Sequence, residues 1–187
     1  MVLVDWRTDK LSDWSSTSDD PIESRRLTWM TTKHPANSEV FMSFQSEPGI
    51  IRWKVHFKSS PERVFAALAT DEGRARFWAE SAPEVDGVIT FHILNYEPFS
   101  GRILVRNEPT VFSLEYFGTV VEFSLSGDGK GGTDLSLLAT NVDESIRMEM
   151  VAGWVSVLLA MKAAVDHDID LRNHDKSRAW ESGFADN

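Results

Sequence analysis

The sequence predicts an α+β domain in which a curved antiparallel sheet wraps around one long helix near the C-terminus. Residues 51–57 alternate between apolar and polar side chains, as a strand with one buried face does. Between residues 84 and 142, short turn sequences separate the apolar runs, which is typical of hairpins in an antiparallel sheet. Residues 143–167 carry apolar side chains at helical spacing. An apolar sheet face has to be covered, and this helix is its largest apolar partner.

Two short helices are expected directly after the first strand. Ser60-Pro61-Glu62 supplies an N-cap residue and a proline for the first helical position, and apolar residues follow at helical spacing up to Ala69. A second helix is predicted from Thr70-Asp71 to about Phe77-Trp78. The pair has the order of a helix-turn-helix unit, but it lacks the basic face that reading DNA requires. We therefore expect these helices to close one end of the sheet.

The strands that follow are short and are joined by turns rich in Gly, Pro, Asn and Asp. They are predicted at residues 85–94, 102–107, 111–117, 120–125 and 133–141. Residues 127–132, Gly-Asp-Gly-Lys-Gly-Gly, form a hairpin tip between the last two strands. This tip does not resemble a phosphate-binding loop, because no helix follows it to supply amide donors and a helix dipole.

The long helix is predicted over Asp143–His167. Charged residues flank its apolar side chains, as expected for a helix that covers a sheet in water. At a rise of 1.5 Å per residue it would be roughly 36 Å long, which is enough to cross the sheet. The apolar stripe consists of Val151, Trp154, Leu158, Met161 and Val165.

The chain is divided into an N-terminal extension, residues 1–49, and a domain, residues 50–187, whose C-terminal tail begins at about residue 168. Residues 1–19 show no apolar period, and Asp20-Pro21 starts a predicted helix over residues 21–33. The side chains expected to hold the C-terminal tail on the domain are Arg172, Arg178, Trp180 and Phe184.

Composition limits the classes of function. The 187 residues include no cysteine, which excludes disulfides, thiolate metal sites and cysteine nucleophiles. A formal net charge of −10 disfavours binding to nucleic acids and to anionic membranes. The N-terminus has no basic stretch followed by an apolar run, and no uninterrupted apolar stretch approaches eighteen residues. We expect a cytoplasmic protein with neither a nucleic-acid nor a membrane partner.

A series of short motifs extends along residues 50–187. In order they are Ser59-Ser60-Pro61-Glu62-Arg63-Val64-Phe65-Ala66-Ala67-Leu68, Phe77-Trp78, Gly101-Arg102-Ile103-Leu104, Glu108-Pro109, Val121-Glu122-Phe123-Ser124-Leu125, Gly132-Thr133, and Gly153-Trp154 with Leu158 and Lys162. With these motifs the chain resembles the heat-shock-protein ATPase activator homologue family, within the superfamily of START, pollen-allergen and polyketide-cyclase domains. The closing segment from Asp170 resembles the tail of one bacterial branch of uncharacterised members.

The resemblance implies a helix-grip fold, in which the sheet curls around the long helix and leaves a hydrophobic cavity. Members of this superfamily bind lipids, sterols, hormones or polyketides, and a minority are cyclases, aromatases or hydrolases. The expectation is a domain that binds a small hydrophobic molecule, without catalysis and without a cofactor. Two alternatives stay open, a cyclase- or hydrolase-like enzyme that uses the cavity and a chaperone-associated interaction module. Homodimer formation is open as well.

Candidate ligand-binding residues are mostly aromatic and apolar, and the same side chains could simply fill a core. They are Trp53, Trp78, Phe91, His92, Tyr116, Phe123, Trp154, Leu158 and Met161. For an enzyme, His92 and Tyr96 are the acid–base candidates, but either the Ile89 or the Val88 side of their strand could face inward.

Metal-type side chains gather only around the end of the long helix. They are His167, Asp168, Asp170, His174 and Asp175. Their spacing matches no compact zinc pattern, so no metal site and no catalytic residue is assigned.

Overall fold

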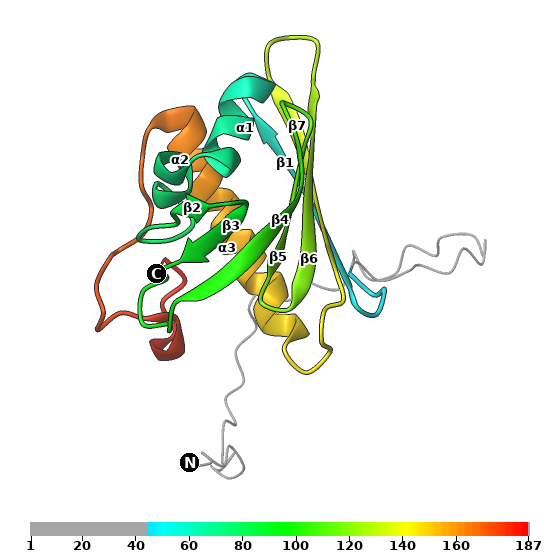
Figure 1. Ribbon diagram of the computed structural model, residues 1–187. Coiled ribbons are helices and arrows are strands. Elements are labelled where there is room, and N and C mark those ends of the chain that lie inside the picture. Colours follow the sequence, from blue (N-terminus) through cyan, green and yellow to red (C-terminus); the bar gives the residue numbers. More distant parts are fainter. Residues whose placement is uncertain (1–44, 187) are drawn as a thin grey trace, which may run out of the picture. The chain divides into compact units, whose positions relative to one another are not determined.

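The computed structural model describes residues 45–186, in which three α-helices lie on a seven-stranded sheet (Figure 1). The elements are β1 (Ile50–Phe57), α1 (Pro61–Ala69), α2 (Asp71–Ala75), β2 (Glu84–Val85), β3 (Val88–Phe91), β4 (Phe99–Asn107), β5 (Val111–Tyr116), β6 (Thr119–Gly127), β7 (Thr133–Thr140), α3 (Arg147–His167) and the 3-10 helix η2 (Trp180–Ser182). This order is the predicted one, and the α+β fold class is confirmed. The predicted helix over residues 21–33 and most of the 1–49 extension lie outside the described residues.

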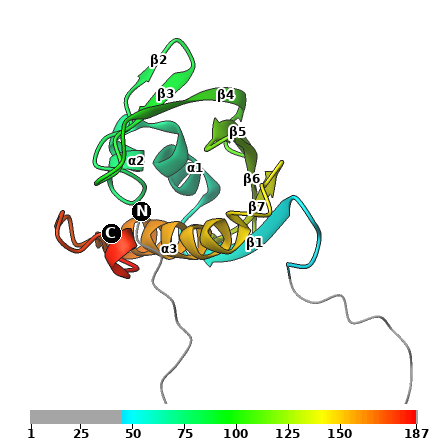
Figure 2. The same cartoon turned by 90° about the horizontal axis from the view of Figure 1, so that it is seen from below.

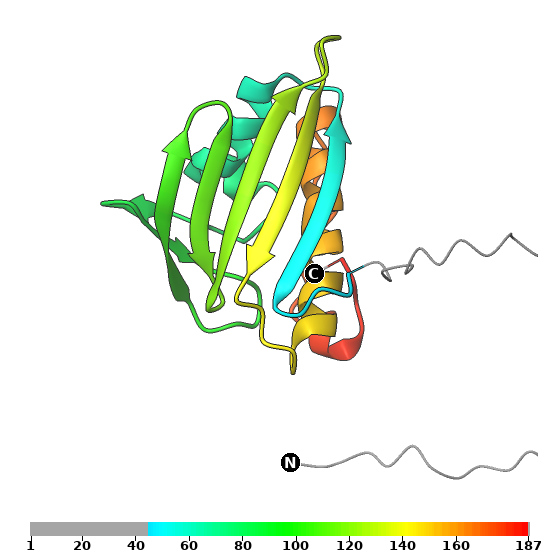
Figure 3. The same ribbon diagram turned by 90° about the vertical axis from the view of Figure 1, so that its right-hand side faces the viewer.

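Every pair of neighbouring strands in the sheet is antiparallel. The strand order is β1-β7-β6-β5-β4-β3-β2, so the first strand pairs with the last one. Figure 2 shows the sheet curling around the helices, and Figure 3 shows α3 running alongside β1. Helix α1 packs on the same concave face, where it contacts β5, β6 and α3. The two helices therefore cover the apolar face of the sheet together.

A bulge and a glycine in β4 allow this curvature. The register between β4 and β5 shifts between Ile103 and Val105, and such bulges bend a strand and increase its twist. A Cβ atom on Gly101 would lie 2.1 Å from the carbonyl oxygen of Glu115. A glycine is therefore needed for β4 to approach β5 this closely.

The predicted strand over residues 85–94 is a hairpin followed by a loop. Asp86 and Gly87 both have positive φ, 50° and 75°, and form the two-residue turn between β2 and β3. Ile89 and Phe91 are fully buried, so their side of β3 faces the core. This settles the inward side of the strand that the sequence left open.

The apolar stripe of α3 is buried as predicted. Trp154, Leu158, Met161 and Val165 are at most 5% exposed, and Val151 packs against the same core. The helix begins at Arg147 instead of at Asp143. Before it, the Asp143 carboxylate accepts hydrogen bonds from the backbone N–H and the hydroxyl of Ser145, at 2.9 and 2.8 Å. Such a side-chain contact stabilises a turn in competition with the helix.

Helix α3 is also long and apolar enough to cross a membrane when only its length and composition are considered. The sequence analysis considered only uninterrupted apolar stretches and therefore did not identify this helix as a candidate membrane span. Core helices of water-soluble proteins meet the same criteria, so the evidence for a membrane span is weak. Here Trp154, Leu158 and Met161 belong to the core that the sheet and α1 share with this helix.

Polar side chains fasten both ends of α3 to β1. Near the helix N-terminus, the Arg147 guanidinium donates to the carbonyl oxygen of Ile50 at 2.7 Å. Near the C-terminus, Lys162 donates to the His56 carbonyl oxygen and lies 3.0 Å from the Asp166 carboxylate. The carboxylate of Asp166 also accepts from the backbone N–H groups of Lys58 and Ser59, at 3.0 and 3.1 Å. These contacts set the position of the helix along the strand.

Asp166 is expected to make the domain sensitive to acid. Burial raises the pKa of this carboxyl, but the hydrogen bonds from Lys58, Lys162 and Ser59 outweigh it and lower the pKa to about 2. Because the folded-state pKa lies below the unfolded-state value near 4, this stabilisation is present above about pH 5 and is lost as the pH falls towards 2. Asp166→Asn should lower the free energy of unfolding at pH 7 by about 2 kcal/mol.

Urea unfolding of Asp166→Asn and wild type between pH 7 and pH 2.5 tests this expectation. The stability difference should shrink as the pH falls. Asp134→Asn is the control, since that carboxylate is exposed and pairs with the exposed His56, and its loss should change the stability by a few tenths of a kcal/mol. A difference between Asp166→Asn and wild type that stays constant with pH would contradict the assignment.

One buried arginine organises the segment after β1. Arg74 in α2 is fully buried. Its guanidinium donates to the carbonyl oxygen of Ala82 at 2.8 and 3.0 Å and to that of Leu68 at 3.0 Å. It also reaches the Asp71 carboxylate at 2.6 Å. The Arg74 carbonyl oxygen accepts from the backbone N–H of Trp78 at 2.9 Å, so this residue also positions the tryptophan that follows.

Candidate ligand-binding pocket

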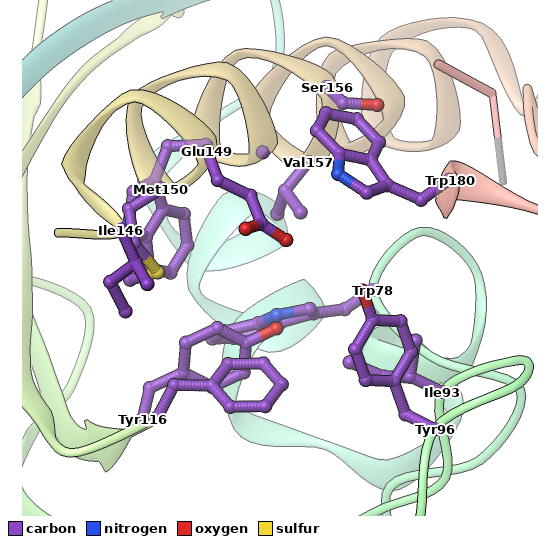
Figure 4. A pocket seen from close by; sticks show the side chains of 13 residues that line it. Trp78, Ile93, Tyr96, Tyr116, Ile146, Glu149, Met150, Ser156, Val157 and Trp180 are labelled. Atoms are coloured by element: carbon purple, nitrogen blue, oxygen red, sulfur yellow. The ribbon is translucent and has the colours of Figure 1, made fainter. Parts of the chain in front are cut away.

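A pocket of about 360 Å³ lies between α3, the segment after α2, the end of β5 and the C-terminal tail (Figure 4). Rim residues Phe117 and Ile146 are about 40% exposed, so the pocket opens to solvent. Most of its lining side chains are aromatic or aliphatic. The lining consists of Trp78, Ile93, Tyr96, Tyr116, Phe117, Ile146, Glu149, Met150, Gly153, Trp154, Ser156, Val157 and Trp180.

The wall contributed by α3 is a second apolar face of that helix. Ile146, Met150, Gly153 and Val157 follow one another at spacings of three and four residues, which places them on one side. This side lies next to the buried stripe that contains Trp154. No atom lies within 4 Å of a Cβ built on Gly153, so the missing side chain there leaves open space in the wall.

Across from this face lie the large rings of Trp78 and Tyr116, which pack against Trp154 of α3. The ring centroids of Trp78 and Tyr116 are 5.2 Å apart, and Trp154 lies 6.0 Å from Trp78 and 5.3 Å from Tyr116. All three residues are at most 7% exposed. Contacts at these separations orient the rings as well as bury them, so the wall is preformed.

The C-terminal tail supplies part of the rim. Trp180 in η2 lines the pocket, and the tail around it is tied to the domain by hydrogen bonds. Ser156 on α3 donates to the carbonyl oxygen of Ala185 at 2.6 Å, and the Asn95 side chain donates to that of Lys176 at 2.9 Å. The pocket is therefore built from elements that are far apart in the sequence.

Further along the tail, Arg172 donates to the carbonyl oxygens of Ala79 and Ala75, both at 2.6 Å, and pairs with Asp170 at 2.6 Å. Arg178 pairs with Asp175 at 3.3 Å. Both predicted arginines thus form ion pairs in the tail, and Arg172 also fastens the tail to the segment after α2.

Two tyrosine hydroxyls belong to the lining, and both are kept neutral. Burial raises the pKa of Tyr116, which lies beside the Trp78 indole N–H. Burial also raises the pKa of Tyr96, and the carboxylates of Glu181 and Glu149 raise it further. The Tyr96 hydroxyl interacts with the Glu181 side chain. Neither hydroxyl is poised to act as a base near neutral pH.

The structure brings some of the predicted site residues together. Trp78, Tyr116 and Trp154 line the pocket. Phe91 and Phe123 lie behind this wall, with ring centroids 5.2 and 5.6 Å from that of Trp78. These five residues form one aromatic cluster.

The other predicted site residues lie elsewhere. Leu158 and Met161 are buried in the core below the pocket wall of α3. His92 is half-buried and forms backbone hydrogen bonds with Ser81 and Glu80, outside the pocket lining. Trp53 on β1 packs partly buried against the core, opposite Leu137 of β7.

Four of the five metal-type side chains near the end of α3, namely Asp168, Asp170, His174 and Asp175, contact oppositely charged or titratable partners. Asp168 pairs with Arg76, and His174 contacts the carboxylates of Glu80 and Asp170 at 2.9 and 3.2 Å. Within residues 45–186, no three His, Asp or Glu side chains are arranged to hold a metal ion.

Sequence reasoning missed most of the α3 wall and the role of the tail. The spacing of Ile146, Met150, Gly153 and Val157 was a usable signal, because it marks a second apolar face beside the predicted stripe. For Trp180 no local signal exists, since its position depends on where the tail crosses the domain.

No protein-family model matches the sequence, and no curated protein matches it either. Many solved structures share the fold. The protein SSP2350 from Staphylococcus saprophyticus is 20% identical, with a TM-score of 0.58 over 66% of this chain and 96% of that one. The Aha1 dimer from Colwellia psychrerythraea is 21% identical, with a TM-score of 0.57 over 63% of this chain and 96% of that one.

A conserved protein of unknown function from Enterococcus faecalis, EF2215, is 17% identical, with a TM-score of 0.57 over 70% of this chain and 81% of that one. Structural matches at identities this low are evidence for a shared fold alone. They confirm the helix-grip fold that the sequence motifs predicted, and the likeness to Aha1 holds at that level. Function has to be argued from the pocket.

Proposed function

We propose that this domain binds a small hydrophobic molecule in the pocket between α3 and the Trp78–Tyr116 wall. The observation that carries the proposal is a cavity of about 360 Å³ whose lining is mainly aromatic and aliphatic. Ligand sites in proteins generally have volumes of roughly 300–1,000 Å³, apolar walls and a few polar groups that orient the ligand. Glu149, Tyr96 and Ser156 are such groups here.

Binding without catalysis is favoured by the chemistry of the lining. The acid–base candidate His92 lies outside the pocket lining, and burial raises the pKa of both Tyr96 and Tyr116. Ser156 donates its hydroxyl to the carbonyl oxygen of Ala185, and no histidine lies among the lining residues to activate it. A cyclase- or hydrolase-like mechanism therefore has less support than binding.

Adjacent positions on α3 offer a matched test. Gly153→Leu places a side chain in the open space of the pocket wall, whereas Ala152→Leu adds the same side chain at an exposed position outside the lining. We expect wild type and Ala152→Leu to bind the neutral fluorescent dye Nile red saturably. Gly153→Leu should lower the affinity by about tenfold or more, which corresponds to ~1.4 kcal/mol.

Thermal unfolding provides the control for folding, because replacing glycine by leucine in a helix should not weaken it. Equal Nile red affinity of the two leucine variants would contradict the proposal, and so would an absence of saturable binding to wild type.

A further inference from the structure

The described lining of the pocket includes one acidic side chain and no basic one. Among its lining residues within the described part of the chain, Glu149 carries a carboxylate, and none of the others is Lys, Arg, His or Asp. Figure 4 shows the Glu149 carboxylate projecting from α3 across from the Trp78 and Tyr116 rings. In residues 45–186, no hydrogen bond or ion pair engages this carboxylate. Glu149 therefore lies exposed at the pocket, and the described residues supply no counter-ion for it.

The rings opposite Glu149 add to the attraction for positive charge. The faces of aromatic rings carry partial negative charge and attract cations within about 6 Å, and tryptophan does so most strongly. Trp78 and Tyr116 form the wall opposite Glu149, and the Trp154 ring of α3 lies 6.0 and 5.3 Å from theirs. Tyr96 and Trp180 complete the lining near the rim. A positive group between this wall and Glu149 would meet a carboxylate and several rings together.

The electrostatic surroundings of the pocket disfavour anionic ligands. Glu181 interacts with the Tyr96 hydroxyl and brings a second carboxylate close to the rim. Within the described residues, no basic side chain lines the pocket and could pair with an acidic ligand. A fatty acid or another anion would meet repulsion from Glu149 and Glu181.

Glu149 also has a purely structural effect, which has to be separated from ligand binding. It lies in the first turn of α3, where a negative charge interacts favourably with the helix dipole. That interaction does not depend on the charge of a ligand. Comparing a charged ligand with a neutral one of the same shape therefore isolates the binding role.

From these observations we propose that the pocket selects a hydrophobic cation, either a protonated amine or a quaternary ammonium group on an apolar body, with Glu149 as its counter-ion. This inference rests on the proposed function, because it names the class of ligand for the same pocket. The apolar body packs against α3 at Met150 and Val157, and the positive group lies between Glu149 and the aromatic wall.

Phenyltrimethylammonium and its neutral isostere tert-butylbenzene, each competing with Nile red, provide the test. Wild type should bind the ammonium compound about tenfold more tightly than the isostere, because an ion pair and cation–π contacts add to equal apolar burial. Glu149→Gln should reduce this ratio to about threefold or less, because it weakens binding of phenyltrimethylammonium and does not weaken binding of tert-butylbenzene.

The control is Glu62→Gln, which removes an exposed carboxylate from the first turn of α1, away from the pocket lining. Its ratio should equal that of wild type. A wild-type ratio near one, or a ratio that Glu149→Gln leaves unchanged, overturns the cation inference while the proposed function stands. If neither probe displaces Nile red because Nile red itself does not bind, both the inference and the proposed function are overturned.

Discussion

Replacing Arg74 by methionine is expected to lower the free energy of unfolding by about 3–5 kcal/mol, as removal of a buried charged partner typically does. The side chain is fully buried, and its guanidinium satisfies the carbonyl oxygens of Leu68 and Ala82. Methionine fills much of the space but donates no hydrogen bond, so both oxygens would remain buried without a partner. The melting temperature of a domain of this size should fall on the order of 10 °C.

Arg63→Met is the matched control, since Arg63 lies exposed on the neighbouring helix α1. This substitution should change the stability by no more than about 0.5 kcal/mol. Urea unfolding followed by circular dichroism measures both variants. Arg74→Met with wild-type stability would show that the segment between α1 and β2 does not depend on this arginine.

The substitution Trp78→Ala should cost a similar amount, about 3–5 kcal/mol, for a different reason. The indole is 4% exposed and contacts five other rings, namely Phe77, Phe91, Tyr116, Phe123 and Trp154. Truncation would leave a large apolar cavity that the rigid neighbouring rings cannot close. It would also remove a wall of the pocket, so Nile red should bind more weakly.

Trp180→Ala is the comparison, because this half-buried tryptophan lines the same pocket from its rim. Thermal unfolding should show a loss of less than about 1.5 kcal/mol for the rim variant. Added indole should raise the melting temperature of Trp78→Ala, since an apolar cavity can take up a ligand of matching shape. If Trp78→Ala lowered the free energy of unfolding as little as Trp180→Ala does, the prediction that Trp78 is central to the aromatic cluster would be wrong.

Much of the fold could be predicted from local patterns, because the spacing of apolar residues shows which side of a strand or helix is buried. The alternation from Ile51 to Phe57 identified the buried face of β1, and the spacing of Trp154, Leu158 and Met161 identified the buried side of α3. The start of α3 was misplaced by four residues, since the Asp143–Ser145 turn competes with a helix that the periodicity alone would continue. The role of Arg74 was not predictable, because an arginine in a short helix is normally exposed.

The pocket could be predicted only in part. Trp78, Tyr116 and Trp154 are predicted ligand-binding residues that also line the pocket, and their role in ligand binding stays a prediction. Whether a ring such as Phe123 faces the cavity or lies one layer deeper depends on packing between elements, which no single segment encodes. From the sequence, Glu149 is one of the charged residues that flank the apolar side chains of the long helix. Its position at the pocket depends on how α3 packs against the other elements.

The pairing of the first strand with the last one has a consequence for how the chain folds. Ile50 of β1 lies opposite Thr140 of β7, so this part of the sheet can form only after residues 133–140 have been synthesised. Such a high contact order is associated with folding in milliseconds to seconds, slower than for helical bundles. During this time β1 remains an unpaired edge on the ribosome. The charges of Arg52 and Lys54 on its exposed side oppose association with other nascent chains.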